Sequence, residues 1–111
     1  LSLIKAKKEF NIDLANVTEL WRHGSVVSSW LLDLTADTLK ADQNLDNIRA
    51  HVPDSGEGRW TVNESIEQGV PTPVMTMALM SRFASQGADD YASKLLAKMR
   101  QGFGGHAVTK T

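Results

Sequence analysis

The amino-acid sequence predicts an all-α fold, and three observations point to it. Apolar residues recur at intervals of three and four along most of the 111-residue chain, which is the period of an amphipathic helix. Glycine and proline separate these periodic segments at positions typical of helix ends. No segment keeps the two-residue alternation of a half-buried strand, so we expect no β-sheet.

The first two predicted helices lie near the start of the chain. Residues 1–10 have the pattern of the last turns of a helix. Because no capping residue precedes Leu1, we expect this helix to begin upstream of the sequence. Asp13 can cap the next helix through its side chain, and Gly24 would end or bend that helix.

A third helix is predicted from Ser25, since the apolar residues that follow keep the helical period. Residues 40–49 are polar and predict a looser helix or a loop. Residues 53–58 (PDSGEG) are typical of turns, so we expect a surface loop there. The residues that define the third helix are Val26, Val27, Trp30, Leu31, Leu34 and Thr38.

After this loop, the sequence predicts a helix with a capping box. Thr61 would be the N-cap and Glu64 the third helical residue, and Trp60 would pack as a hydrophobic staple. Gly69 would end this helix.

The next predicted helix begins with Thr72 as N-cap and Pro73 as first helical residue, and Gly87 ends it. It is apolar on nearly every side, which predicts burial partly against another domain or subunit. Its methionines are interpreted as core filler. The apolar residues are Val74, Met75, Met77, Ala78, Leu79, Met80 and Phe83.

The last helix is expected to begin at Asp89 or Asp90 and to end near Arg100, whose charge suits the negative end of the helix dipole. Residues 101–111 then form a glycine-rich tail. Ordering its backbone would cost about 1–2 kcal/mol per residue, more than its few apolar side chains can offset. The tail is therefore either disordered, which its composition alone favours, or held against another surface and a ligand.

Composition excludes several classes of function. The net charge of −1 argues against a nucleic-acid-binding protein, and no apolar run is long enough to cross a membrane. Because cysteine is absent, disulfides and thiolate metal sites are excluded, and a cytoplasmic location is expected. The three histidines lack the spacing of metal ligands, so we expect no metal site.

Arg82 lies on the nearly all-apolar helix, where an unpaired charge is costly. Two interpretations stay open on the residues alone. The side chain either extends its charged end to solvent or forms half of a salt bridge, or it binds an anion, because the guanidinium fork matches phosphate and carboxylate.

Several motifs together resemble the C-terminal domain of decarboxylating 6-phosphogluconate dehydrogenase. Each motif is weak alone, but their order and spacing match the family over nearly the whole chain. They are Trp21–Ser25 (WRHGS), Ser29–Leu32 (SWLL), Gly56–Thr61 (GEGRWT), Gly69–Pro71 (GVP), Arg82–Phe83 and Phe103–His106 (FGGH).

The resemblance implies an oxidoreductase that converts 6-phosphogluconate to ribulose 5-phosphate with NADP or NAD. It implies that residues 1–100 are a substrate-binding and dimerisation domain and that residues 101–111 are a tail reaching into the partner's active site in a homodimer. In the family, the Rossmann domain and the catalytic lysine and glutamate precede this region. The segment is therefore expected to hold no catalytic residue and to be inactive alone.

By position, the resemblance implies that Arg82, Arg100 and His106 bind the substrate. Two departures stand out: Ser55 replaces a lysine of longer members, and the duplicated helices of those members are absent. The alternatives are therefore a related β-hydroxyacid dehydrogenase with another acid substrate, or a helical interaction module without a ligand.

Overall fold

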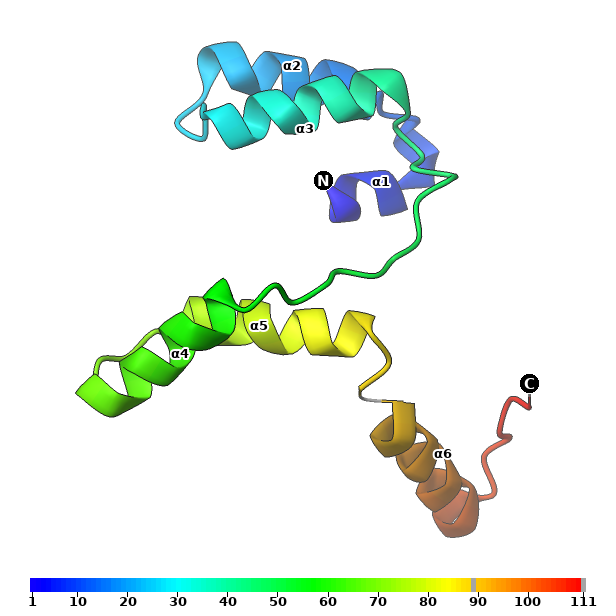
Figure 1. Cartoon of the computed structure of the whole chain (residues 1–111). Helices are drawn as coiled ribbons and strands as arrows, with labels where there is room; N and C mark the ends of the chain where they lie inside the picture. Colours follow the sequence, from blue (N-terminus) through cyan, green and yellow to red (C-terminus); the bar gives the residue numbers. More distant parts are fainter. Residues whose placement is uncertain (89, 111) are drawn as a thin grey trace. The chain divides into compact units, whose positions relative to one another are not determined.

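The computed structural model describes residues 1–88 and 90–110, and every regular element in these ranges is helical, which confirms the all-α prediction. The chain divides into two compact units, Leu1–Ile48 and a second unit that begins at Arg49 (Figure 1). The first unit holds α1 (Ser2–Ala6), the 3-10 helix η1 (Lys8–Phe10), α2 (Leu14–Gly24) and α3 (Trp30–Ala41). The second holds α4 (Glu57–Gln68), α5 (Pro73–Ser85) and α6 (Asp90–Gly104).

In the first unit, α2 and α3 lie side by side and share a small core (Figure 1). Leu14, Ala36 and Leu39 are buried there, and Thr18 is completely buried. The hydroxyl of Thr18 donates to the carbonyl oxygen of Leu14 at 2.9 Å, so this buried polar group is satisfied within its own helix.

A cluster of ion pairs also joins these two helices. The guanidinium of Arg22 on α2 lies 3.2 Å from a carboxylate oxygen of Asp33 and 3.7 Å from one of Asp37, both on α3. It also lies 3.2 Å from Glu19 in its own helix. The charges of this cluster thus find partners within the unit.

The starts of α2 and α3 are set by side-chain caps. Asp13 accepts a hydrogen bond from the amide of Asn16, as predicted. The prediction that the third helix begins at Ser25 is wrong, because Ser29 caps α3 by accepting from the amide of Leu32. The hydroxyl of Ser25 instead donates to the carbonyl of Trp21 and helps to close a turn.

The other ends of this unit also differ from prediction. The predicted helix over residues 1–10 is interrupted after α1, and η1 ends at Asn11 in the left-handed conformation. In the stretch over 40–49, α3 ends at Ala41, and the carboxylate of Asp42 then accepts three backbone amides and organises a loop.

In the second unit, α4 packs on α5. The predicted capping box is wrong, since α4 begins at Glu57 and Thr61 lies inside it, donating to the carbonyl of Glu57. The N-cap is Gly56, whose φ of +112° turns the chain directly from the loop into the helix. The end at Gly69 is confirmed, with a φ of +66°.

α5 begins at Pro73 after Thr72, as predicted, although the hydroxyl of Thr72 donates to Ser65 and does not cap the helix. Within its unit only Leu79 of α5 is buried, and Val74 and Met77 are largely exposed. The interpretation of the methionines as core filler is therefore wrong for this chain, because α4 covers one side of α5 only.

α6 begins at Asp90, and the alternative start at Asp89 lies outside the described residues. The helix continues to Gly104, so residues 101–104, assigned to the tail from the sequence, are helical. None of its described residues is buried. No described helix combines the length and apolar character needed to span a bilayer.

Candidate functional site

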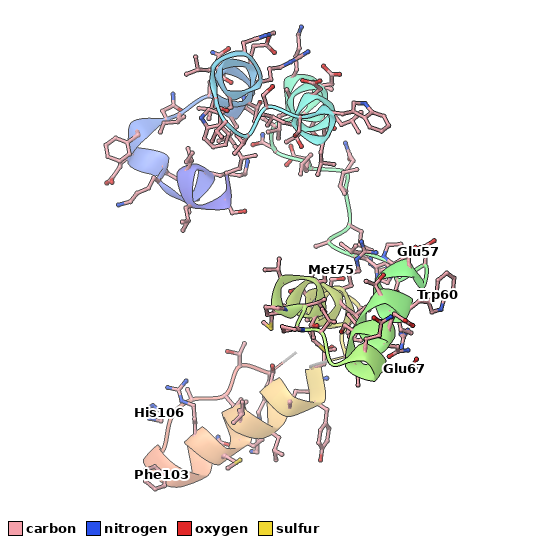
Figure 2. The ribbon with its side chains drawn as sticks, turned by 90° about the vertical axis from the view of Figure 1, so that its left-hand side faces the viewer. Glu57, Trp60, Glu67, Met75, Phe103 and His106 are labelled. Carbon is pink, nitrogen blue, oxygen red and sulfur yellow. The ribbon has the colours of Figure 1, made fainter. Side chains whose placement is uncertain are left out.

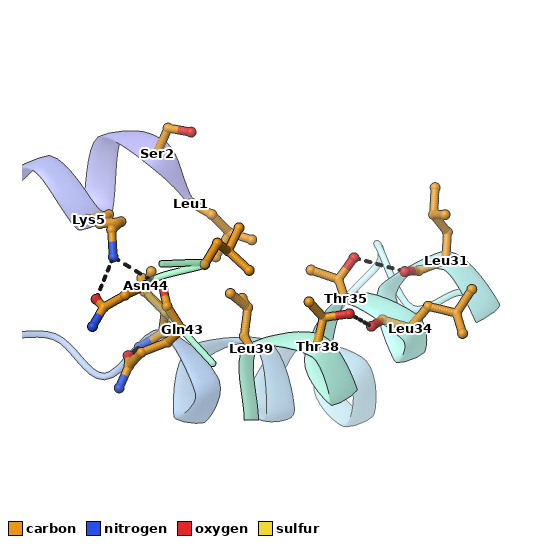
Figure 3. A pocket seen from close by; sticks show the side chains of 12 residues that line it. Leu1, Ser2, Lys5, Leu31, Leu34, Thr35, Thr38, Leu39, Gln43 and Asn44 are labelled. Atoms are coloured by element: carbon orange, nitrogen blue, oxygen red, sulfur yellow. Dashed lines mark hydrogen bonds between the residues drawn. The ribbon is translucent and has the colours of Figure 1, made fainter. Parts of the chain in front are cut away.

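Two pockets have to be compared as candidate sites. The pocket of the first unit, about 360 Å³, is lined by residues of α3 together with residues from the start of the chain and from the loop after α3 (Figure 3). Its hydroxyls are used by the helix itself, since Thr35 and Thr38 donate to the carbonyls of Leu31 and Leu34. Lys5 at its rim donates to Gln43 and Asn44. The lining of this pocket includes no guanidinium and no imidazole.

The second pocket lies at the C-terminal end of α6 and has different chemistry. It is an open hollow of about 650 Å³ whose lining combines an apolar floor with one guanidinium and one imidazole. The lining residues are Leu96, Met99, Arg100, Gly102, Phe103 and His106. Figure 2 shows Phe103 and His106 at this end of the helix.

Glycine allows His106 to return to the helix end. A Cβ atom on Gly104 would lie 2.9 Å from Nε2 of His106, so the imidazole occupies space that a side chain would take. Gly105 turns the chain with a φ of +67°, a conformation that favours glycine. Two of the three predicted site residues, Arg100 and His106, are thereby brought to one pocket.

Arg82, the third predicted site residue, is exposed on α5 and does not line this pocket. Its Nη1 donates to the carbonyl oxygen of Pro53 at 3.1 Å. Because a guanidinium has five N–H donors, this single bond to a neutral carbonyl leaves most of its donors for other partners.

A cluster beside Arg82 was missed by the sequence analysis. Nε and Nη2 of Arg59 donate to Oδ2 of Asp54 at 3.0 and 2.7 Å, and the guanidinium lies 4.9 Å from the centre of the Phe83 ring. Oδ1 of Asp54 accepts the amide of Gly56. The spacing of five residues crosses from loop to helix, so no helical period signals this pair.

The carboxylates of this cluster stay ionised. The hydrogen bonds from Arg59 hold the pKa of Asp54 below its usual range, and the backbone amide of Gly56 adds to this effect. The hydroxyl of Ser55 donates to Glu57 and lowers the pKa of that carboxyl. The charge of Arg82 lowers both pKa values further. The loop before α4 thus places two carboxylates and two guanidinium groups near one another.

The described residues contain no group of three or more side chains that could hold a metal ion. The arrangement at the end of α6 is instead suited to binding an anion. A guanidinium and an imidazole line the same pocket there, and both can donate charge-assisted hydrogen bonds to a phosphate or carboxylate.

Comparison with known proteins adds a family to this geometry. A family model described as "6-phosphogluconate dehydrogenase, C-terminal domain" matches residues 2–110. The Bacillus subtilis protein YqeC, provisionally named a 6-phosphogluconate dehydrogenase, is 41% identical over 92% of this chain and 34% of its own length. An NAD(+)-dependent, decarboxylating 6-phosphogluconate dehydrogenase of Haloferax volcanii is 35% identical over 95% of this chain and 36% of its own length. The chain thus spans about a third of the length of these two relatives.

Proposed function

Because the chain belongs to the family of 6-phosphogluconate dehydrogenase C-terminal domains, we propose that it is the substrate-binding and dimerisation domain of such an enzyme. The enzyme would oxidise 6-phosphogluconate and decarboxylate it to ribulose 5-phosphate. NADP or NAD would accept the hydride, bound mainly by an N-terminal domain. The name of the Haloferax volcanii relative supports a nicotinamide cofactor.

The observation that carries this proposal is the convergence of Arg100 and His106 on one pocket. The guanidinium of Arg100 can donate two parallel hydrogen bonds to a phosphate, and the imidazole can donate a further one. Each charge-assisted bond of this kind contributes about 1.5–3 kcal/mol. We assign both residues to substrate binding. We assign Arg82 to the same role, because its remaining N–H donors suit the phosphate group of the substrate.

The surface of α6 supports a role in dimerisation. Its apolar side chains recur at helical spacing, yet none is buried within the chain. A helix with an uncovered apolar face is stabilised by packing on another surface. We propose that a second copy of the chain covers this face and that the end of α6 with Arg100, together with residues 105–110, reaches into the partner's active site. The exposed residues are Tyr91, Leu95, Leu96, Met99 and Phe103.

Substitutions of the pocket residues in the full-length protein test the proposal. Arg100→Gln and His106→Asn should each raise KM for 6-phosphogluconate by about 10- to 100-fold, the loss of one charge-assisted bond. Lys94→Gln is the matched control, since Lys94 is a cation on the same helix that does not line the pocket. If KM is unchanged and association alone is weakened, the chain is an interaction module and substrate binding is refuted.

Mixed dimers test the exchange of the tail. If Arg82 and the partner's Arg100 serve one site, a dimer of one Arg82→Gln and one Arg100→Gln subunit has one doubly damaged site and one intact site. Mixing the two variants should then restore about half of the wild-type activity per mixed dimer, because two-fold symmetry pairs the sites in this way. If each subunit completes its own site, every site keeps one defect and no activity returns.

A further inference from the structure

Arg82 is hydrogen-bonded to the loop that leads into α4, and two carboxylates of this region could compete with a bound anion. Asp54 follows directly on Pro53, whose carbonyl accepts the hydrogen bond from Arg82. Glu57 lies at the start of α4, and the charge of Arg82 acts on both carboxyl groups. An arginine paired with a protein carboxylate has its charge partly compensated and fewer N–H donors left for a phosphate. What keeps Arg82 unpaired therefore matters for substrate binding.

Arg59 satisfies the first of these carboxylates. Two of its N–H groups bond to Oδ2 of Asp54, at 3.0 and 2.7 Å, and the backbone amide of Gly56 bonds to Oδ1 at 3.1 Å. The side chain of Asp54 is only 10% exposed, so water can supply few alternative partners. Stacking of the guanidinium on Phe83 fixes Arg59 in this position. The hydroxyl of Ser55 donates a hydrogen bond to the second carboxylate, that of Glu57.

We propose that Arg59 is a positioning residue that engages Asp54 and thereby keeps Arg82 available for the phosphate of the substrate. This inference rests on the proposed role of Arg82 in substrate binding. Without Arg59, the nearly buried carboxylate of Asp54 would need another cation, and Arg82 is the other cation that acts on it. Arg82 would then turn from the substrate to Asp54.

The loop does not depend on Arg59 alone for its place on α5. The amide of Val52 donates to the hydroxyl of Ser85 at 3.0 Å, and the side-chain amide of Gln86 donates to the carbonyl of Val52 at 2.7 Å. Without Arg59, we therefore expect Arg82 to pair with Asp54 while the loop stays in place on α5. This difference makes the proposal distinguishable from a purely structural role.

The test is a set of substitutions in the full-length enzyme with 6-phosphogluconate as substrate. Arg59→Gln should raise KM about five- to tenfold, the size of a coupling between contacting residues, with little change in kcat. Adding Asp54→Asn should bring KM back toward the wild-type value, because the competing charge is gone while the asparagine oxygen can still accept the amide of Gly56. Arg59→Lys, which keeps the charge but not the fork, should lie between.

Arg49→Gln is the matched control, an exposed arginine of the same unit, and should leave KM unchanged. Thermal unfolding of each variant shows whether it is folded. The inference is overturned if Arg82→Gln raises KM while Arg59→Gln does not, or if Asp54→Asn fails to restore the Arg59→Gln enzyme. If Arg82→Gln itself leaves KM unchanged, the proposed role of Arg82 is refuted and the inference with it. If Arg59→Gln does not fold, an unchanged KM in the Arg59→Lys enzyme overturns the inference.

Discussion

The helix pair α2 and α3 and the single helix α6 use similar residues in opposite ways. In the pair, Leu14 and Leu39 are buried, and the guanidinium of Arg22 lies close to three carboxylates of the same unit. In α6, no described residue is buried, and Arg100 faces an open pocket. Groups that are satisfied internally stabilise a fold, whereas apolar and charged groups left available are suited to binding. Under the proposed function, the first region is a scaffold and the second a binding surface.

The largest expected effect is a loss of stability when a leucine of the helix pair is replaced, compared with a leucine of α6. Leu39→Ala removes a side chain that is 8% exposed in the core of the pair, which should lower the free energy of unfolding by about 2–5 kcal/mol. Leu95→Ala changes a side chain that is 48% exposed in the chain, so its effect should come through a partner. Chemical denaturation of the full-length protein at several protein concentrations measures both.

The dependence on concentration is the control in this experiment. The loss from Leu39→Ala should be the same at all concentrations, whereas the loss from Leu95→Ala should shrink on dilution, since it acts on association. A loss from Leu95→Ala that is large and independent of concentration would place Leu95 in a core of its own protomer. The contrast between scaffold and binding surface would then fail.

The way in which helices begin gives a second contrast. Asp13 and Ser29 cap helices of the first unit with their side chains, whereas the N-cap of α4 is Gly56, which has a φ of +112° and no side chain. Gly56→Ala should destabilise the protein by about 1–3 kcal/mol, because this backbone is strained for alanine. The added Cβ would also lie 2.8 Å from the ring of Trp60, which has to shift.

Gly58→Ala is the matched control for this substitution. It lies two residues further on, inside α4, and a Cβ there would meet nothing within 4 Å. Alanine in a helix is favoured over glycine, so Gly58→Ala should stabilise the protein by about 0.5–1 kcal/mol. Thermal unfolding in which both substitutions shift the midpoint in the same direction would contradict the conformation given to Gly56.

These helix starts also explain how far the sequence could predict the fold. The Asp13 cap, the end of α4 at Gly69 and the start of α5 at Pro73 each depend on local residues. The structure confirms all three. The capping box at Thr61 failed because its pattern also fits a helix interior, where threonine donates to the preceding turn. Local patterns decide whether a helix can start, but the conformation of Gly56 decides where α4 does.

The candidate site shows a similar limit. The motif that carries Arg100 and His106 is short and local, and both residues line one pocket because the chain turns at Gly105. The pair of Arg59 and Asp54 could not be predicted, since it joins a loop to a helix across an irregular turn. Its signal, an aspartate and an arginine flanking glycines, is too common to single out.

The smallest expected effect concerns pH and the ion pairs of the first unit. Glu19 on α2 receives hydrogen bonds from both His23 and Arg22, and the contact with His23 is the larger cause of its lowered pKa. A carboxyl whose pKa is lower in the folded than in the unfolded protein stabilises the fold above its unfolded value, here about 4.5. That contribution is lost as the pH falls through the folded pKa.

Thermal unfolding between neutral and acidic pH should therefore show a falling midpoint, with a smaller fall in Glu19→Gln, which cannot ionise. The difference should be slight and should shrink further in high salt, because the pair is exposed and screened by water. In α6 no comparable network joins the described side chains of Arg100 and His106, so Arg100→Gln should leave this pH dependence of stability unchanged. If the pH dependence of the unfolding midpoint disappears in Arg100→Gln and persists in Glu19→Gln, then Arg100 and not Glu19 contributes to stability. The assignment of scaffold and binding surface would then be wrong.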